Sequence, residues 1–144
     1  MELLVMRHGS AEESTDDFNR RLTQQGRDEV LAASRLISRH HYRPEVIYSS
    51  PLLRARQTAG IVAEQFSLDV VECDSIVPEG DCREVCEWLG QQGSGKILIV
   101  SHQPFVSLFV RYLTGEQRYM DTASLSMIHL DEGTWQRGRL EWVE

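Results

Sequence analysis

The chain has 144 residues, of which 41% are hydrophobic and 26% are charged, and its formal net charge is −7. This length and composition predict one domain over residues 1–144 with a hydrophobic core of its own. The negative charge argues against a nucleic-acid partner, which requires a basic surface. No apolar stretch approaches the roughly 20 residues of a membrane span, so we expect no membrane partner.

The cysteines and the first residues bear on the compartment. Cys73, Cys82 and Cys86 are odd in number and lack metal-ligand spacing, which is typical of reduced thiols in a cytosolic protein. The opening MELLVMRHG has no basic region ahead of its apolar run, unlike a signal peptide. We therefore predict a cytoplasmic, monomeric protein that uses no metal or other cofactor.

Strand and helix patterns alternate along the chain. Apolar runs bounded by Gly or Pro predict strands, and apolar residues at helical spacing predict helices. In chain order the predicted elements are a strand at 3–6, a polar loop at 16–22, a helix from Thr23 to about residue 40, a strand at 44–48, a helix at 52–66 with Pro51 at its start, a strand at 68–71, a helix at 81–91, a turn at 93–95, a strand at 97–100, a helix at 104–113, a strand at 125–130, a turn at 131–133 and a strand at 139–143.

This alternation predicts an α/β fold. Specifically, we expect a three-layer α/β/α sandwich with a mostly parallel central sheet, helices on both faces, and an antiparallel strand addition at the C-terminal end. In such a sheet, ligands bind outside the carboxyl ends of the strands.

The first strand ends in Arg7-His8-Gly9. The planar fork of arginine suits a phosphate or carboxylate, because it donates two parallel hydrogen bonds. Histidine acts as a nucleophile or an acid and base near neutral pH. Glycine lets the backbone turn sharply or approach another chain segment closely.

Two other strand ends carry similar chemistry. The second is followed by Ser49-Ser50-Pro51, with Arg54 at the start of the next helix, and the fourth by Ser101-His102-Gln103-Pro104. Because parallel strands end at one edge, two histidines, two arginines and two helix N-termini are expected to converge. Helix N-termini favour anions, so the sequence predicts a phosphate site at this edge.

Together these residues resemble the histidine phosphatase superfamily, also called the phosphoglycerate mutase-like or RHG family. The short, SixA-type phosphohistidine phosphatases look most similar. The matching motifs are Met6-Arg7-His8-Gly9, Arg20-Arg21-Leu22-Thr23-x-x-Gly26, Ser49-Ser50-Pro51-Leu52-Leu53-Arg54-Ala55-x-Gln57-Thr58-Ala59, Gly80-Asp81 and Ser101-His102-x-Pro104.

The resemblance implies roles for individual residues. His8 would be the nucleophile that becomes transiently phosphorylated, and Arg7, Arg54 and His102 would hold the phosphoryl group. Arg20 would add a donor. The family usually has proline after that arginine, and Arg21 stands there instead. Which of the two arginines faces the site therefore stays open.

Two further phosphate contacts, Gly9 and Gln103, are also expected. The general acid is an open point: Glu79 lies in the region where larger superfamily members carry one, whereas the resemblance to the short members implies no dedicated acid there. A protonated phosphoimidazole leaves as neutral imidazole and needs little acid help, but an alkoxide leaving group needs a general acid.

The resemblance predicts a phosphatase for phosphohistidine on a protein, such as a phosphotransfer domain or a phosphotransferase-system carrier. Only 47 residues lie between Arg54 and His102. Relatives that act on small metabolites generally carry a long insertion there that roofs the pocket. One alternative is a small-molecule phosphomonoesterase of the same superfamily. Another is a phosphohistidine-binding module without turnover.

Other polar residues are expected to have ordinary structural roles. Ser49 and Ser50 are predicted to cap the following helix. Arg56 is predicted to be a solvated helix charge. His40 and His41 are predicted to lie in solvent at a helix C-terminus.

Overall fold

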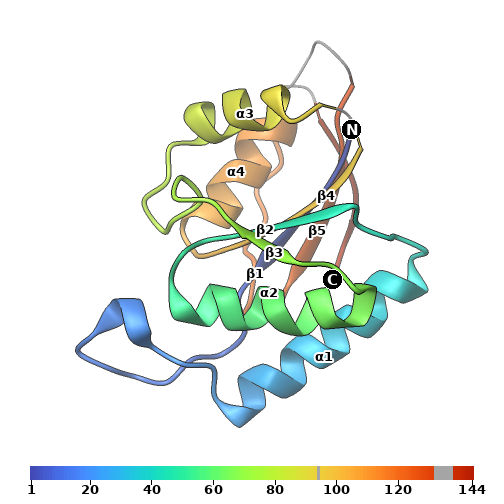
Figure 1. Cartoon of the computed structure of the whole chain (residues 1–144). Helices are drawn as coiled ribbons and strands as arrows, with labels where there is room; N and C mark the ends of the chain where they lie inside the picture. The colour runs from blue at the N-terminus through green and yellow to red at the C-terminus, as the bar shows by residue number, and fades with distance from the viewer. Residues whose placement is uncertain (94, 132–137) are drawn as a thin grey trace.

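The computed structural model describes residues 1–93, 95–131 and 138–144 (Figure 1). The predicted turns at 93–95 and 131–133 therefore lie partly outside the described residues. In chain order the elements are β1 (Glu2–Arg7), a 3₁₀ turn η1 (Asp17–Asn19), α1 (Gln24–Arg39), β2 (Val46–Ser49), α2 (Leu53–Phe66), β3 (Val70–Glu72), α3 (Cys82–Gln91), β4 (Lys96–Ser101), α4 (Phe105–Thr114), β5 (Leu125–His129) and β6 (Arg139–Val143).

The strands form one sheet in the order β3-β2-β4-β1-β5-β6. The pairs β2–β3, β2–β4 and β1–β4 are parallel, whereas β5 pairs antiparallel with both β1 and β6. The prediction of a mostly parallel sheet with an antiparallel C-terminal addition is confirmed. In the described part of the chain, no helix is both long and apolar enough to cross a membrane.

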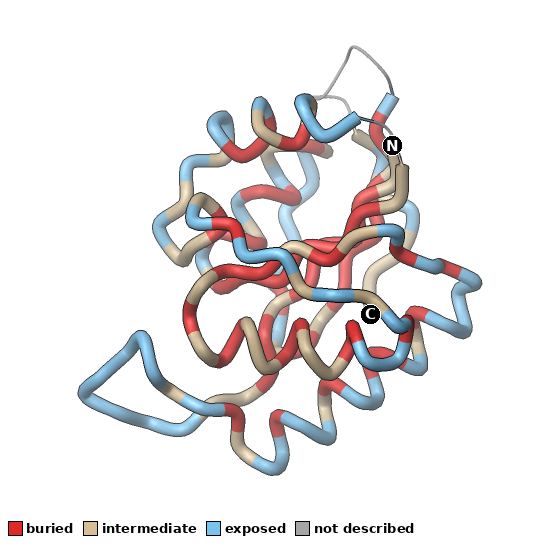
Figure 2. The backbone as a smooth tube through the Cα atoms, viewed as in Figure 1, coloured by how far each residue is buried: buried red, intermediate tan, exposed pale blue. Residues whose placement is uncertain are grey.

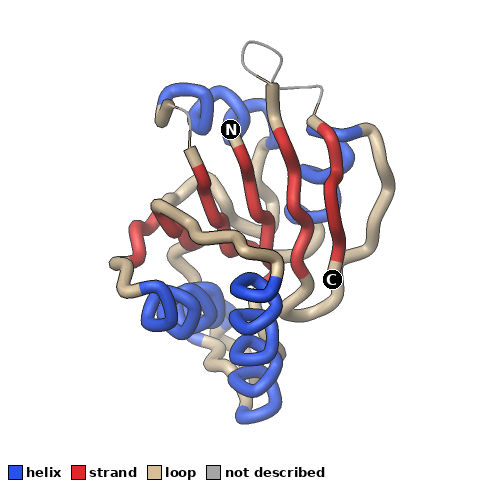
Figure 3. Tube along the Cα trace, turned by 90° about the vertical axis from the view of Figure 1, so that its right-hand side faces the viewer, coloured by secondary structure: helices blue, strands red, loops and turns tan. Residues whose placement is uncertain are grey.

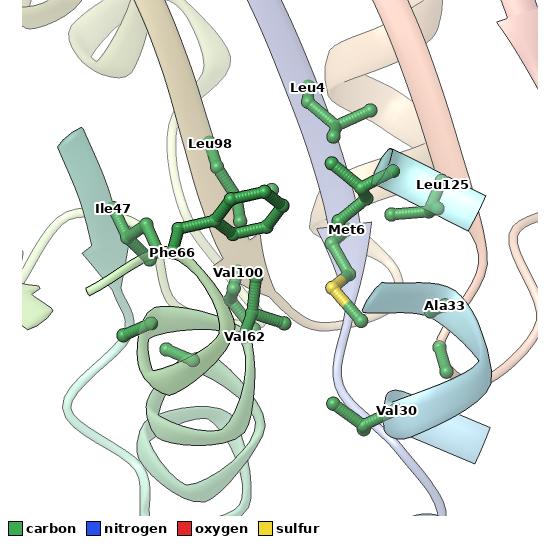
Figure 4. Packing of buried hydrophobic residues seen from close by; sticks show 14 of the residues in the cluster. Leu4, Met6, Val30, Ala33, Ile47, Val62, Phe66, Leu98, Val100 and Leu125 are labelled. Atoms are coloured by element: carbon green, nitrogen blue, oxygen red, sulfur yellow. The ribbon is translucent and has the colours of Figure 1, made fainter. Parts of the chain in front are cut away.

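Helices cover both faces of the sheet, because alternate residues of the central strands point to opposite sides (Figure 3). Leu4 and Met6 of β1 join the cluster beneath α1 and α2, which Figure 4 shows at close range. Leu3 and Val5 join the cluster beneath α3 and α4. Figure 2 shows this buried centre between exposed outer helix faces, so the three predicted layers are present.

The strand register aligns the three chemistry-bearing ends. Arg7 is paired with Ser101, and Ser49 with Val100. The His8 N–H continues the ladder by donating to the Ser101 carbonyl over 3.0 Å. The residues after β1, β2 and β4 therefore emerge at one edge, as the sequence predicts.

The second helix and third strand differ slightly from expectation. Pro51 precedes α2 by two residues, because Leu52 rather than Pro51 is the N-cap. At the other end, Ser67 takes a left-handed conformation and the Leu68 N–H donates back to the Ala63 carbonyl. This closing turn uses residues 67 and 68, so β3 begins only at Val70.

The end of α1 also departs from prediction. His41 is exposed, as expected, but His40 is not simply solvated. Its ring stacks on Trp142 with centroids 3.9 Å apart, and its Nε2 lies 3.1 Å from a Glu144 carboxylate oxygen. Trp142 belongs to β6 and Glu144 directly follows it, so the C-terminal segment supplies both contacts. The helix pattern alone could not reveal them.

Two glycines let the loop after β1 lie directly on the start of α1. A Cβ on Gly9 would come within 2.7 Å of the Gly26 carbonyl oxygen, and one on Gly26 within 2.0 Å of the Ser10 carbonyl oxygen. The Thr23 N–H donates to that same Ser10 oxygen over 3.0 Å. No larger residue fits at either position without moving backbone.

We predict that Gly26→Ala lowers the free energy of unfolding by about 1–3 kcal/mol, because its Cβ would overlap fixed backbone. Gly60→Ala is the matched control, since it also lies in a helix but has nothing within 4 Å of its Cβ. That change should raise stability by about 0.5–1 kcal/mol. Urea unfolding of the three proteins measures both effects, and equal effects of the two substitutions would contradict this packing.

Candidate active site

His8 stands at the centre of this edge, immediately after β1. Its Nδ1 lies 2.6 Å from the Gly9 carbonyl oxygen. Because a carbonyl can only accept, Nδ1 carries the proton and donates it there. The other nitrogen, Nε2, then keeps its lone pair, and the Arg54 Nε–H donates to it over 3.3 Å. A neutral imidazole with its lone pair on Nε2 is suited to nucleophilic attack.

His102 directly follows β4, and its ring lies beside that of His8, with the ring centroids 5.0 Å apart. Its Nε2 lies 2.7 Å from the Ser50 hydroxyl oxygen, and that oxygen also accepts from the Leu52 N–H over 3.2 Å. The hydroxyl proton can therefore go to Nε2, which favours Nδ1–H on His102. Nδ1 is buried and has no hydrogen-bond partner among the described residues, so it is available as a donor to a ligand.

Ser50 belongs to the site for this reason, and sequence reasoning placed it differently. The prediction of a helix cap is right only in that Ser50 accepts the Leu52 N–H just ahead of α2. Ser49 does not cap the helix, because its hydroxyl donates to the Ser50 carbonyl. A signal existed in the parallel strand ends, since Ser50 and His102 follow adjacent strands.

Arg54 is buried in the first turn of α2. Its Nη1 donates to the Asp17 carbonyl over 2.8 Å, and its Nη2 lies 3.5 Å from the Asp17 carboxylate. Thr58, one turn on, donates to the Arg54 carbonyl and accepts from the Gly9 N–H. The helix therefore fixes both the arginine and the loop that holds His8.

Arg7 reaches the site from the last residue of β1. Its Nη1 donates to the Met120 carbonyl over 3.0 Å and to the Tyr119 hydroxyl over 3.3 Å. Its buried Nε has no partner among the described residues. The guanidinium is thus held at one end and retains donors for an anion.

Arg20 and Arg21 differ in environment. Arg20 donates to the Glu12 carbonyl over 2.7 Å and pairs with Asp17, and 27% of its side chain is exposed. Arg21 is 66% exposed and pairs with Glu12. Of these two arginines, Arg20 alone has a charge that lowers the pKa of both site histidines. Arg20 is therefore the better candidate for the additional donor.

Four other residues singled out in the sequence have the following surroundings in the structure. The Gly9 N–H is taken by Thr58, so Gly9 holds the loop and offers no free backbone donor to phosphate. Gln103 uses its amide on Ser107 and on the Met120 carbonyl. Glu79 is exposed, and no hydrogen bond or ion pair joins it to another described residue. Arg56 is not simply solvated, because it donates to the Pro51 carbonyl and lies near Glu72.

Both histidines are held neutral. Burial is the largest cause for His8; the Gly9 carbonyl opposes it, the charges of Arg54, Arg7 and Arg20 reinforce it, and the pKa falls from 6.5 to about 4. Burial again comes first for His102, followed by the charge of His8 and the same arginines, and lowers its pKa to about 2. The site therefore presents neutral rings among positive charges at pH 7.

Comparisons with known proteins agree with this geometry. The model of the histidine phosphatase superfamily (branch 1) matches residues 3–77, more than half of the chain. This chain belongs to that superfamily. The predicted resemblance is confirmed, and with it the expectation of a phosphatase at the level of the family.

Three individual proteins are similar to this chain over most of its length. A solved protein histidine phosphatase SixA, complexed with tungstate, is 30% identical, with a TM-score of 0.90 and coverage of 99% of this chain and 96% of that one. A phosphohistidine phosphatase SixA homolog of Haemophilus influenzae is 29% identical over 130 residues, 81% of this chain and 79% of that protein. An uncharacterized protein of Picosynechococcus is 32% identical over 111 residues, 72% of this chain and 67% of that protein.

Within the described ranges, no three His, Cys, Asp or Glu side chains are grouped so that they could hold a metal ion. A metal-free and cofactor-free reaction stays a prediction.

The depressed pKa of His8 is directly measurable. In NMR spectra of the folded protein, the His8 ring signals should titrate near pH 4 rather than near 6.5. Arg54→Met should move this midpoint upward, because one of the lowering charges is removed. An unchanged midpoint in Arg54→Met, or a wild-type midpoint above 6, would contradict the electrostatic account.

Proposed function

We propose that this protein removes the phosphoryl group from phosphohistidine on a partner protein, through a covalent phospho-His8 intermediate. The observation that carries the proposal is the state of His8, a neutral ring whose lone pair is on Nε2 beside Arg54. Arg7, Arg54 and Arg20 supply the positive charge that a phosphoryl group requires, and His102 adds a neutral donor.

In the first step, His8 Nε2 attacks phosphorus, the new P–N bond forms, and the substrate's P–N bond breaks. The electron pair of the broken bond stays on the substrate imidazole, which leaves as a neutral ring when its other nitrogen is protonated. During the transfer, the equatorial oxygens of the phosphoryl group would lie among the guanidinium groups, which stabilise their negative charge.

In the second step, water attacks phosphorus and the His8 Nε2–P bond breaks. The Gly9 carbonyl retains the proton on Nδ1, so phospho-His8 is a cationic phosphoimidazolium whose leaving group is neutral imidazole. Inorganic phosphate takes the oxygen of the water, one proton is released, and His8 returns to its starting tautomer. Neither step calls for a strong general acid.

Two observations favour phosphohistidine on a protein over a small ester. Glu79 is exposed and contacts no described site residue, so this carboxylate is not positioned to protonate an alkoxide. The proteins that this chain is similar to include a protein histidine phosphatase SixA complexed with tungstate, a tetrahedral oxyanion like phosphate, and a phosphohistidine phosphatase SixA homolog. The partner's identity, the monomeric state and the cytoplasmic location stay predictions.

The function is tested by paired rates without added metal. The protein should dephosphorylate a phosphohistidine-bearing phosphotransfer domain rapidly and para-nitrophenyl phosphate slowly. His8→Ala should lose on the order of 10⁴-fold or more in rate, because the nucleophile is gone. Arg54→Ala should lose on the order of 10²–10³-fold.

The control for a histidine change is His41→Asn, at an exposed residue in the left-handed region that asparagine tolerates. It should keep the full rate. Strong hydrolysis of the ester with an inert phosphoprotein would overturn the proposed substrate. Tight binding of the phosphoprotein with no turnover would support a binding module instead.

Glu79→Gln separates the two candidate reactions. On the phosphoprotein we expect less than a twofold change, because a protonated imidazole leaves unaided. If the protein is instead a phosphomonoesterase that uses Glu79 as its acid, hydrolysis of the ester should fall on the order of 10²-fold or more. Rate measurements at matched pH on both substrates distinguish these outcomes.

A further inference from the structure

A groove of about 450 Å³ begins beside the catalytic residues and follows the outer face of α4. Gln103, the neighbour of His102, is one of its lining residues. Tyr119 is another, and its hydroxyl accepts a hydrogen bond from Arg7. The groove is therefore connected to the phosphoryl site through two of its residues.

The lining combines apolar surface with two arginines. Leu108 is 50% exposed and Tyr119 is 72% exposed, although both are large hydrophobic side chains. Arg111 also lines the groove, and no hydrogen bond or ion pair joins its guanidinium group to another described residue. Arg118 has one long pair, 3.7 Å, with Glu116.

This charge contrasts with the rest of the chain. The eight lining residues include two arginines and no carboxylate, whereas the chain as a whole has a net charge of −7. The loop between β1 and α1 alone carries Glu12, Glu13, Asp16 and Asp17. The net charge of the chain therefore disfavours acidic partners in general, whereas the groove presents positive charge to them locally.

The geometry points to a docking site for an α-helix of the phosphohistidine-bearing protein, with an acidic side chain about two turns from the phosphohistidine. This inference rests on the proposed function and names the surface that recognises the partner. From Pro104 to Arg111, α4 rises by roughly 10 Å, at about 1.5 Å per residue. Two turns of a partner helix span the same length, so its i+7 position would lie near Arg111 when position i lies beside Pro104, two residues after His102.

A helix suits this groove better than an extended segment. An extended segment needs backbone hydrogen bonds from the surface that receives it, whereas a helix satisfies its own and docks through side chains. The groove is lined by side chains that could receive a helix. Leu108 and Tyr119 would contact an apolar residue at i+3 or i+4, and Arg111 would pair with a carboxylate at i+7.

Two helical peptides that carry a non-hydrolysable phosphonate analogue of phosphohistidine test the inference. One has Glu seven residues after the analogue and the other has Lys, and the free analogue amino acid is a third probe. Dissociation constants come from fluorescence anisotropy or, for the free analogue, from NMR titration. We expect the Glu peptide to bind on the order of tenfold more tightly than the Lys peptide at low salt.

Arg111→Glu should abolish or reverse this preference, and Arg111→Gln should reduce it to about twofold or less. Arg35→Glu makes the same charge change at an exposed position of α1 outside the groove, and should keep the preference. Melting curves check that each variant is folded.

Three results would overturn the docking site. In the first, the unmodified protein binds the Glu and Lys peptides equally tightly. In the second, it binds the free analogue amino acid as tightly as the peptides. In the third, the protein forms a dimer that Arg111→Glu abolishes. The first excludes charge recognition, the second indicates a small-molecule groove, and the third assigns the surface to a second copy of the chain. Because these probes are not hydrolysed, dephosphorylation of a phosphohistidine-bearing phosphotransfer domain by the unmodified protein tests the proposed function separately.

Discussion

The hydrogen bond from His8 Nδ1 to the Gly9 carbonyl, 2.6 Å long, determines what the site can do. It fixes the ring proton on one nitrogen and thereby leaves the lone pair on the other, facing Arg54. It also keeps that proton in place when the ring would carry a phosphoryl group. The carbonyl is itself fixed, because the Gly9 N–H is bound to Thr58 and the loop lies against Gly26. The chemistry therefore depends on close packing of two glycines far from each other in the sequence.

Among residues 1–93, 95–131 and 138–144, no buried carboxylate offsets the positive charge of the site. The cations around His8 disfavour its protonated form, and burial does the same. The carboxylate nearest to Arg54 belongs to the largely exposed Asp17, so the charge of the arginine is balanced at the surface rather than inside the site. A dianionic phosphoryl group would therefore meet these arginines where their only carboxylate partner among the described residues is largely exposed.

Much of this could be predicted from the sequence, because the decisive residues directly follow apolar strands. Such runs define strand ends well, and parallel pairing then brings Arg7, Ser50 and His102 to one edge. The roles of Ser50 and Gly9 could not be predicted, since each depends on a hydrogen-bond partner from another element. The exposure of Glu79 and the hydrogen bonds of Gln103 likewise depend on how loops pack, which hydrophobic periodicity does not encode. For the same reason, a docking groove formed by α4 and a loop gave no sequence signal.

The central claim is that His8 Nε2 carries the phosphoryl group during turnover. With ¹⁵N-labelled histidine in the protein and a phosphohistidine-bearing donor, base-quenched samples can be examined for ¹⁵N–³¹P coupling. The account predicts coupling at Nε2 of His8, with Nδ1 still protonated before the quench. Phosphorylation at Nδ1, or turnover without any phosphorylated His8, would contradict it.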